Sequence, residues 1–358
     1  MAEKMMGYLK EQPMVWRNLV KNRKQITEAF VKAFKDAAFS QIIVIGSGSS
    51  YNAAYVAKQV FADYLGIRFL PVPPSRALEM LPLYTPEDTV VFFVSQSGES
   101  TNTIGLLDSI HKKGYRTVGL TQLNTSSVAK KCDVFVHIDC GEETVGPKTK
   151  GYSATVLCLY LLCLELSKAR GYMDETSYEA AYSLLDSAFS LADENIMASA
   201  NWAKKHTESF TKAPHMMIVS EGANYPAMLE GALKILECLY IPVTAYEFEE
   251  YLHGVQCSID ENSYIIFVFP DVPNRERMLR LYEFHAAHKG KGFAVAVNKT
   301  TGIEGELLIK TAGADMASVF SVVLPMQLVS VIVSEAKGIN CDTSKFPEFV
   351  KALGTKNW

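Results

Sequence analysis

Short apolar runs alternate along the chain with amphipathic stretches, a pattern typical of parallel β-α-β units. Three runs of the first half recur in the second half, in the same order and offset by 174, 174 and 176 residues. The paired runs are residues 41–46 and 215–220, 90–94 and 264–269, and 116–120 and 292–297. The sequence therefore predicts two copies of one α/β unit of about 170 residues.

This repeat divides the chain into four predicted parts. Residues 1–34 form a leading helical segment, residues 35–195 the first copy, residues 196–340 the second copy, and residues 341–358 a tail that closes the site. The stretch 172–206 between the copies has a helical pattern of polar and apolar positions. We therefore expect it to be packed helix and not a flexible tether.

Composition and charge exclude several kinds of partner and location. Apolar residues make up 48% of the chain, charged residues 21%, and the net charge is −4, so neither nucleic acid nor anionic lipid is expected as a partner. The longest apolar run, residues 154–164, is shorter than the roughly 20 residues that cross a bilayer. Charged residues interrupt the N-terminus where a secretory signal would be apolar. We expect a cytoplasmic protein with no membrane span.

Two turns of the first copy are rich in hydroxyl groups. The turn after the run 90–94 carries Ser95, Ser97 and Ser100 around a glycine, and the turn GSGSS at 46–50 follows the neighbouring run. Both fall at the carboxyl edge of the predicted sheet, where hydroxyls and helix N-terminal amides suit a phosphate group. Such residues also cap helices, and that alternative stays open. Neither turn fits the nucleotide-binding glycine patterns.

The second copy differs at the equivalent turn. Its residues 270–275 read PDVPNR, in which two prolines remove backbone donors and an aspartate repels anions. If this type of turn binds phosphate, only the first copy is expected to do so.

The second copy instead carries a row of charges. Glu230, Lys234 and Glu237 are spaced by four and three residues, so they share one helix face, which is otherwise apolar. A surface salt-bridge stripe would have the same spacing. Apolar surroundings would disfavour the charged carboxylate and move its pKa toward that of a working acid or base. His253 follows in a loop, where a lone histidine is either solvated or catalytic.

Three segments, GSGSSYNA, SQSGES and EETVGPKTKGYSAT, resemble the sugar isomerase (SIS) domain, and the doubled arrangement resembles the isomerase half of glucosamine-6-phosphate synthase over residues 35–340. The resemblance implies two tandem SIS domains of the α/β class, each a parallel five-stranded, flavodoxin-like sheet between helix layers. It also implies that the 6-phosphate of a sugar is held by Ser50, Ser95, Gln96, Ser97 and Ser100. Nearby substrate contacts are expected at Gly48, Ser49, Gly146, Lys148 and Lys150, with 146–150 closing over the sugar.

The segment LEGALKILECLYIPVTAYEFEEYLHG resembles the catalytic segment of the same synthase. By this resemblance Glu237 moves a proton between sugar C1 and C2, His253 assists ring opening, and Glu230 and Lys234 lie beside the substrate. In the family the histidine often reaches the neighbouring subunit's site. The resemblance therefore implies a homodimer with shared sites, or a higher oligomer.

The reaction is a separate question. The chain begins MAEKMM and enters the sugar domain by about residue 40, so we expect no glutaminase and no glutamine-dependent synthesis. The synthase opens the sugar ring with a tail lysine, for which Lys351 and Lys356 are the candidates. A two-SIS chain with VGPKTKG and a Leu-Gly-Thr-Lys tail more closely resembles fructosamine-6-phosphate deglycases.

The resemblance to deglycases implies cleavage of a phosphorylated Amadori compound to glucose 6-phosphate and a free amine, with no metal and no organic cofactor. A phosphosugar aldose–ketose isomerase or aminosugar-phosphate deaminase would use the same residues. A phosphosugar sensor would keep the phosphate turn alone. The identity of the amine stays open at this stage.

Overall fold

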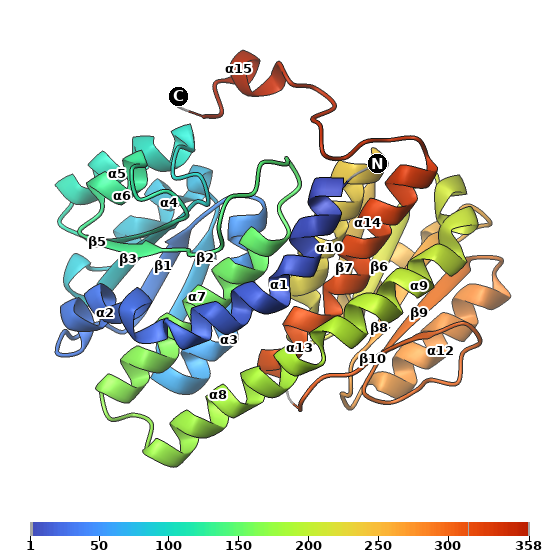
Figure 1. The fold of residues 1–358 in the computed structure, drawn as a ribbon, viewed down its shortest axis with the longest axis horizontal. Helices are drawn as coiled ribbons and strands as arrows, with labels where there is room; N and C mark the ends of the chain where they lie inside the picture. The colour runs from blue at the N-terminus through green and yellow to red at the C-terminus, as the bar shows by residue number, and fades with distance from the viewer. Residues whose placement is uncertain (1–2, 314, 357–358) are drawn as a thin grey trace. The chain divides into compact units, whose positions relative to one another are not determined.

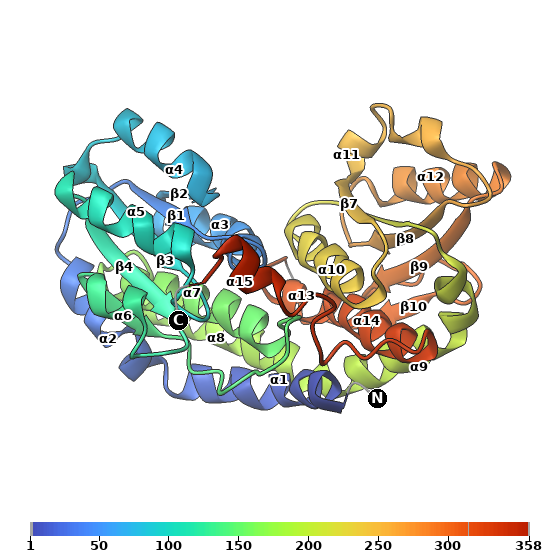
Figure 2. The same cartoon turned by 90° about the horizontal axis from the view of Figure 1, so that it is seen from above.

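The computed structural model describes residues 3–313 and 315–356, which fall into two compact units. We call them the β1–β5 unit, made of Met14–Thr144, Lys150–Ser183 and Lys345–Trp358, and the β6–β10 unit, made of Met1–Pro13, Val145–Thr149 and Leu184–Ser344. Each unit contains one sheet with helices on both faces (Figures 1 and 2). The predicted α/β fold with two copies is confirmed.

The β1–β5 sheet has five parallel strands in the order β2-β1-β3-β4-β5. Its strands are β1 Gln41–Ile45, β2 Arg68–Val72, β3 Thr89–Val94, β4 Arg116–Thr121 and β5 Val134–His137. Strands β1 and β3 are buried along their whole length, because helices cover both faces. This burial explains why their sequences read as continuous apolar runs and do not alternate.

Alternate side chains of these strands pack into two hydrophobic cores, one on each face of the sheet. Ile43, Val91 and Phe93 point to one side and pack with the helices α4 (Pro74–Met80), α5 (Thr101–Lys112) and α6 (Ser127–Lys131). On the other side, Phe92 meets the rings of Phe30 and Phe61 edge-on, at 5.5 and 6.5 Å between centroids. These two rings come from α2 (Arg23–Phe34) and α3 (Ser49–Leu65), and both helices pack on α7 (Lys150–Ala169).

The β6–β10 sheet repeats this plan. Its order is β10-β9-β8-β6-β7, which read from the other edge matches the order of the first sheet. The strands are β6 Met216–Ser220, β7 Val243–Glu247, β8 Tyr264–Phe269, β9 Lys291–Val297 and β10 Leu307–Ile309. The predicted pairing of strand runs between the two copies is therefore confirmed.

Helices also cover both faces of the second sheet. One face packs against α11 (Phe248–Tyr251) and α12 (Arg275–Ala287), through a core that includes Met278 and Leu281. A second layer contains α9 (Ala192–Lys212), α10 (Asn224–Leu239), α13 (Asp315–Val322) and α14 (Leu324–Ala336). Helices α10 and α14 approach closely at Gly231, where a Cβ would lie 2.6 Å from Met326 Cγ.

The helices expected outside the two copies are present. Residues expected to form one or two leading helices form α1 (Glu3–Lys21) and α2, and the expected packed linker forms α8 (Glu175–Ser190) and α9. Two helical stretches, Lys150–Ala169 and Met316–Ala336, are long and apolar enough to cross a membrane. The second was not predicted from the sequence. In an 18-residue window of each stretch, 83% and 94% is buried inside the fold, as is typical of core helices of globular domains.

Candidate active site

The two hydroxyl-rich turns lie at the same sheet edge, as expected. Strands β1 and β3 are paired in parallel, so the β1–α3 turn and the β3–α5 turn both leave from their carboxyl ends. Gly48, just before α3, has a φ of 55°, a conformation that favours glycine, and Ser49 and Ser50 begin the helix. The predicted residues of both turns are thus brought to one edge of the β1–β5 unit.

The β3–α5 turn, residues 95–100, uses its serines as acceptors toward its own backbone. Gly98 N–H donates to Ser95 Oγ at 3.2 Å, and Glu99 N–H donates to Ser97 Oγ at 3.3 Å. A hydroxyl that accepts such a bond keeps its own O–H as a donor. The turn can therefore offer hydroxyl donors to an anion, and phosphate oxygens are acceptors.

Two neighbouring contacts fix the shape of this turn. Gly98 has a φ of 64°, and a Cβ there would lie 2.2 Å from Ser126 Oγ, so only glycine fits. The Glu99 carboxylate accepts from the backbone N–H and the hydroxyl of Ser127, at 2.7 and 2.9 Å, at the start of α6. Glu99 therefore binds the N-terminus of α6.

The C-terminal tail lies against the same turn. Thr101 donates its hydroxyl to Gly354 O at 2.7 Å and its backbone N–H to Thr355 O at 3.3 Å, and Ser100 and Lys356 form an antiparallel bridge. Lys351 is exposed on the short helix α15 (Phe349–Leu353). Of the two tail lysines named by resemblance, Lys356 is thus the one beside the β3–α5 turn.

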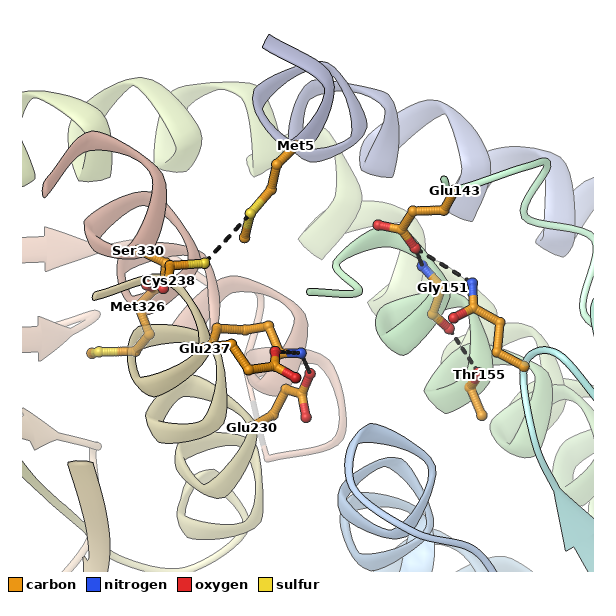
Figure 3. Close-up of polar contacts among 11 residues, drawn as sticks. Met5, Glu143, Gly151, Thr155, Glu230, Glu237, Cys238, Met326 and Ser330 are labelled. Carbon is orange, nitrogen blue, oxygen red and sulfur yellow. Dashed lines mark hydrogen bonds and ion pairs between the residues drawn. The ribbon is translucent and has the colours of Figure 1, made fainter. Parts of the chain in front are cut away.

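A buried carboxylate that the sequence analysis missed meets Gln96. Glu143 is 7% exposed, and its Oε2 accepts from Gln96 Nε2 at 3.4 Å and from Gly151 N–H at 3.0 Å (Figure 3). Gly151 lies in the first turn of α7, where a carboxylate is favoured by the free N–H groups. An acidic residue in a polar loop carries no sequence signal that separates this role from a solvated one.

The predicted charged row on α10 exists in the β6–β10 unit. Lys234 Nζ lies 3.3 Å from Glu230 Oε1 and 2.5 Å from Glu237 Oε2, and Figure 3 shows the two carboxylates on the same side of the helix. The side chains of Glu230 and Lys234 are 0% and 1% exposed, whereas that of Glu237 is 34% exposed. The alternative of a solvated surface stripe is therefore wrong.

Lys234 stays charged in this setting. Burial by itself lowers the pKa of the ammonium, but the charges of Glu230 and Glu237 together outweigh burial and hold the pKa above its ordinary value. Glu237 contacts the ammonium of Lys234 and is also partly exposed. A group that transfers a proton to or from a substrate must be accessible in this way.

Comparison with known proteins identifies the fold family. A family model described as the SIS domain matches residues 37–164, which include both hydroxyl-rich turns. Residues 37–164 of this chain are thus similar to the SIS domain. Its β6–β10 unit repeats the strand order of the matched SIS domain, so the same architecture occurs twice in the chain.

Relatives of this chain are known by sequence and by structure. The isomerizing glutamine–fructose-6-phosphate aminotransferase of Aquifex aeolicus is 28% identical over 357 residues, covering 94% of this chain and 56% of that protein. A proposed phosphosugar isomerase from Clostridium difficile is 26% identical, with a TM-score of 0.92 and 99% of both chains covered. The C-terminal domain of glucosamine-fructose-6-phosphate aminotransferase from Francisella tularensis shares the fold at 22% identity and a TM-score of 0.84, with 95% and 98% of the two chains covered. The chain spans about half the length of the curated relatives it matches.

In the second copy, the turn equivalent to β3–α5 contains a buried arginine in place of the hydroxyl groups. Arg275, which is 5% exposed, donates to Phe269 O at 2.7 Å, to Pro270 O at 3.0 Å and to Lys299 O. Carbonyl oxygens gather here and bind a guanidinium, whereas an anion would require donors. This arrangement supports the expectation that only the first copy's turn suits phosphate.

The other predicted residues are more scattered. His253 is exposed after α11, and within the described residues its side chain makes no hydrogen bond or ion pair. Gly146 and Lys148 belong to the β6–β10 unit, in the segment Val145–Thr149. Lys150 begins α7 of the β1–β5 unit and is 4% exposed.

Two histidines spaced by three residues, His285 in α12 and His288 just after its last residue, differ in their surroundings. His285 is 0% exposed, and among the described residues neither ring nitrogen has a hydrogen-bond partner; His288 is exposed and contacts Phe284 O at 2.7 Å. Burial lowers the pKa of His285 to about 4, from an ordinary 6.5. The unfolded chain therefore binds a proton at a higher pH than the folded chain does.

We expect the free energy of unfolding to fall as the pH is lowered from 6.5 to 4, because protonation of His285 favours the unfolded state. Replacing His285 with leucine removes this proton and should flatten the fall. Chemical denaturation across this pH range measures the effect. Equal pH dependence in wild type and His285→Leu would contradict it.

Proposed function

We propose that this SIS protein is a fructosamine-6-phosphate deglycase, which converts a 6-phosphorylated Amadori compound to glucose 6-phosphate and a free amine. The observation that carries the proposal is the row on α10, where a buried Lys234 sits between the buried Glu230 and the partly exposed Glu237. The hydroxyl-rich β3–α5 turn supports it, because an anionic substrate group has donors there.

In the proposed chemistry, Glu237 transfers a proton between two carbon atoms of the sugar. Its carboxylate takes a proton from C1 of the ketose form, giving an enaminol, and a proton is returned at C2. The product of this transfer is an imine at C1, which water hydrolyses to an aldehyde and an amine. His253 is the proposed second acid or base, for ring opening and hydrolysis.

Lys234 has a supporting part in this chemistry. Its ammonium lies 2.5 Å from Glu237 Oε2 and 3.3 Å from Glu230 Oε1, so it contacts the reacting carboxylate and is held in place by Glu230. A charge that is already in place costs no reorganisation during the reaction.

A second candidate is a phosphosugar aldose–ketose isomerase or an aminosugar-phosphate deaminase. It is supported by the names of the relatives, which are an isomerizing aminotransferase and a proposed phosphosugar isomerase. The same transfer of a proton between C1 and C2 serves both reactions. The two candidates differ in whether an amino acid leaves the substrate.

Replacing Ser97 with aspartate should weaken binding of fructose 6-phosphate by at least about tenfold, because a carboxylate would face the phosphate dianion. Ser177→Asp, exposed at the start of α8 in the same unit, adds the same charge elsewhere and is the control. Isothermal titration calorimetry measures both. If Ser97→Asp binds as wild type does, the phosphate site lies elsewhere.

The function is tested on a panel of 6-phosphorylated Amadori amino acids that differ in the amine, with fructose 6-phosphate plus ammonia as the comparison. The deglycase releases the free amino acid from one or more panel members. Conversion of fructose 6-phosphate alone, with no amino acid released across the panel, would support the isomerase or deaminase and reject the deglycase.

A further inference from the structure

The side chain of Gln96 reaches from the β3–α5 turn to another helix of the same unit. We propose that Glu143 is a positioning residue, which holds this turn in its phosphate-binding form by clamping Gln96 against the N-terminus of α7. We call Gln96, Glu143 and Gly151 the Gln96 clamp. The inference rests on the proposed function, because it takes the turn to be the phosphate site.

The centre of the clamp is a single oxygen atom. Glu143 Oε2 accepts from Gly151 N–H at 3.0 Å and from Gln96 Nε2 at 3.4 Å. The carboxylate is more than nine-tenths buried, so donors of this kind are needed to keep it there. One donor belongs to the 20-residue helix α7 and the other to the turn, so Glu143 links the two.

The space for this link depends on a missing side chain. A Cβ on Gly151 would lie 2.0 Å from Gln96 Nε2 and 2.5 Å from Gln96 Cδ, far inside van der Waals contact. The amide of Gln96 therefore lies directly across the first turn of α7. Alanine at 151 and the observed position of Gln96 exclude each other.

The clamp acts on the serines through the backbone. Gln96 stands between Ser95 and Ser97, and its carbonyl oxygen accepts from Gln122 N–H at 3.0 Å, just after β4. Its side chain is held at α7 and its main chain at β4, so the peptide planes that carry the two serines have little freedom. Small displacements of positioning groups have large effects on binding and turnover.

This role differs from the one implied by family resemblance, in which Gln96 contacts the phosphate. If Gln96 acts only as a phosphate ligand, binding depends on Gln96 and on the space that Gly151 leaves for it, but not on Glu143. The clamp makes all three residues act as one unit, so their substitutions should not be additive.

The test measures binding of inorganic phosphate by calorimetry to the full chain. Gly151→Ala should weaken binding about tenfold, since Gln96 is displaced. Gly105→Ala, inside α5 with open space around it, is the matched control and should bind as wild type does. In the double variant Gly151→Ala/Gln96→Ala the clash is gone, so it should bind as Gln96→Ala alone does.

A second pair of variants tests Glu143 itself. Glu143→Ala should also weaken phosphate binding about tenfold. Glu143→Gln should restore most of it, because an amide oxygen can accept the same two bonds. A purely structural role would lower the melting temperature of Glu143→Ala without changing phosphate affinity in the folded protein.

The outcomes separate this inference from the proposed function. If Gly151→Ala and Glu143→Ala bind phosphate within about twofold of wild type while Ser97→Asp does not bind, the clamp is rejected and the phosphate site stands. If Gly151→Ala does not fold, the Glu143 pair decides. If Ser97→Asp also binds normally, the phosphate site itself is rejected.

Discussion

Glu237→Gln is expected to lower turnover by about two to four orders of magnitude, the usual contribution of a general acid or base. Affinity for fructose 6-phosphate should stay within about twofold, because glutamine has nearly the shape of glutamate and can still accept from Lys234. Steady-state kinetics and calorimetry on the same preparation separate the two quantities.

The control for this experiment is Glu283→Gln, an exposed position on α12 in the same unit. It should leave turnover unchanged. Retention of more than about a tenth of wild-type turnover by Glu237→Gln would remove this residue from the proton transfer. A large loss of phosphosugar affinity would instead assign Glu237 to substrate binding.

The second large effect concerns stability. Lys234→Met should lower the free energy of unfolding by about 3–5 kcal/mol, because Glu230 would remain buried without the ammonium that compensates its charge. Methionine has a similar length, so loss of packing contributes little. Urea unfolding followed by circular dichroism measures the change.

A paired substitution shows whether charge is the cause. Lys234→Met/Glu230→Leu removes both buried charges and should recover most of the lost stability. Lys310→Met is the surface control, since Lys310 and Glu194 form an exposed ion pair at 2.7 Å and its loss should cost less than about 1 kcal/mol. If Lys234→Met alone is as stable as this control, the uncompensated charge of Glu230 does not lower the free energy of unfolding.

The fold could be predicted because its signals are local and repeated. Strands buried on both faces give continuous apolar runs, and a duplicated unit gives each run twice at nearly the same offset. The row on α10 could be predicted for the same reason, since spacings of four and three residues on one helix fix which side chains meet. The second stretch, Met316–Ala336, was not predicted although its mean hydropathy of 2.1 exceeds the 1.3 of Lys150–Ala169, because serine, proline and glutamine residues interrupt its apolar run.

The missed features depend on contacts between residues far apart in sequence. Glu143 meets Gln96 across 47 residues, and Arg275 meets Lys299 across 24. No periodicity encodes such pairs, so a buried carboxylate or guanidinium looks like a solvated one until the fold is known. The difference in burial between Glu230 and Glu237 also required the structure, because both sit on the same helix face.

We propose above that Glu237 moves a proton on a phosphorylated Amadori substrate and thereby frees the amine. The most direct test measures glucose 6-phosphate with a coupled dehydrogenase, and free amine in parallel, for wild type and Glu237→Gln on the best substrate of the panel. We expect equal amounts of both products from wild type and almost none from the variant. Release of fructose 6-phosphate in place of glucose 6-phosphate, or equal rates from both proteins, would contradict it.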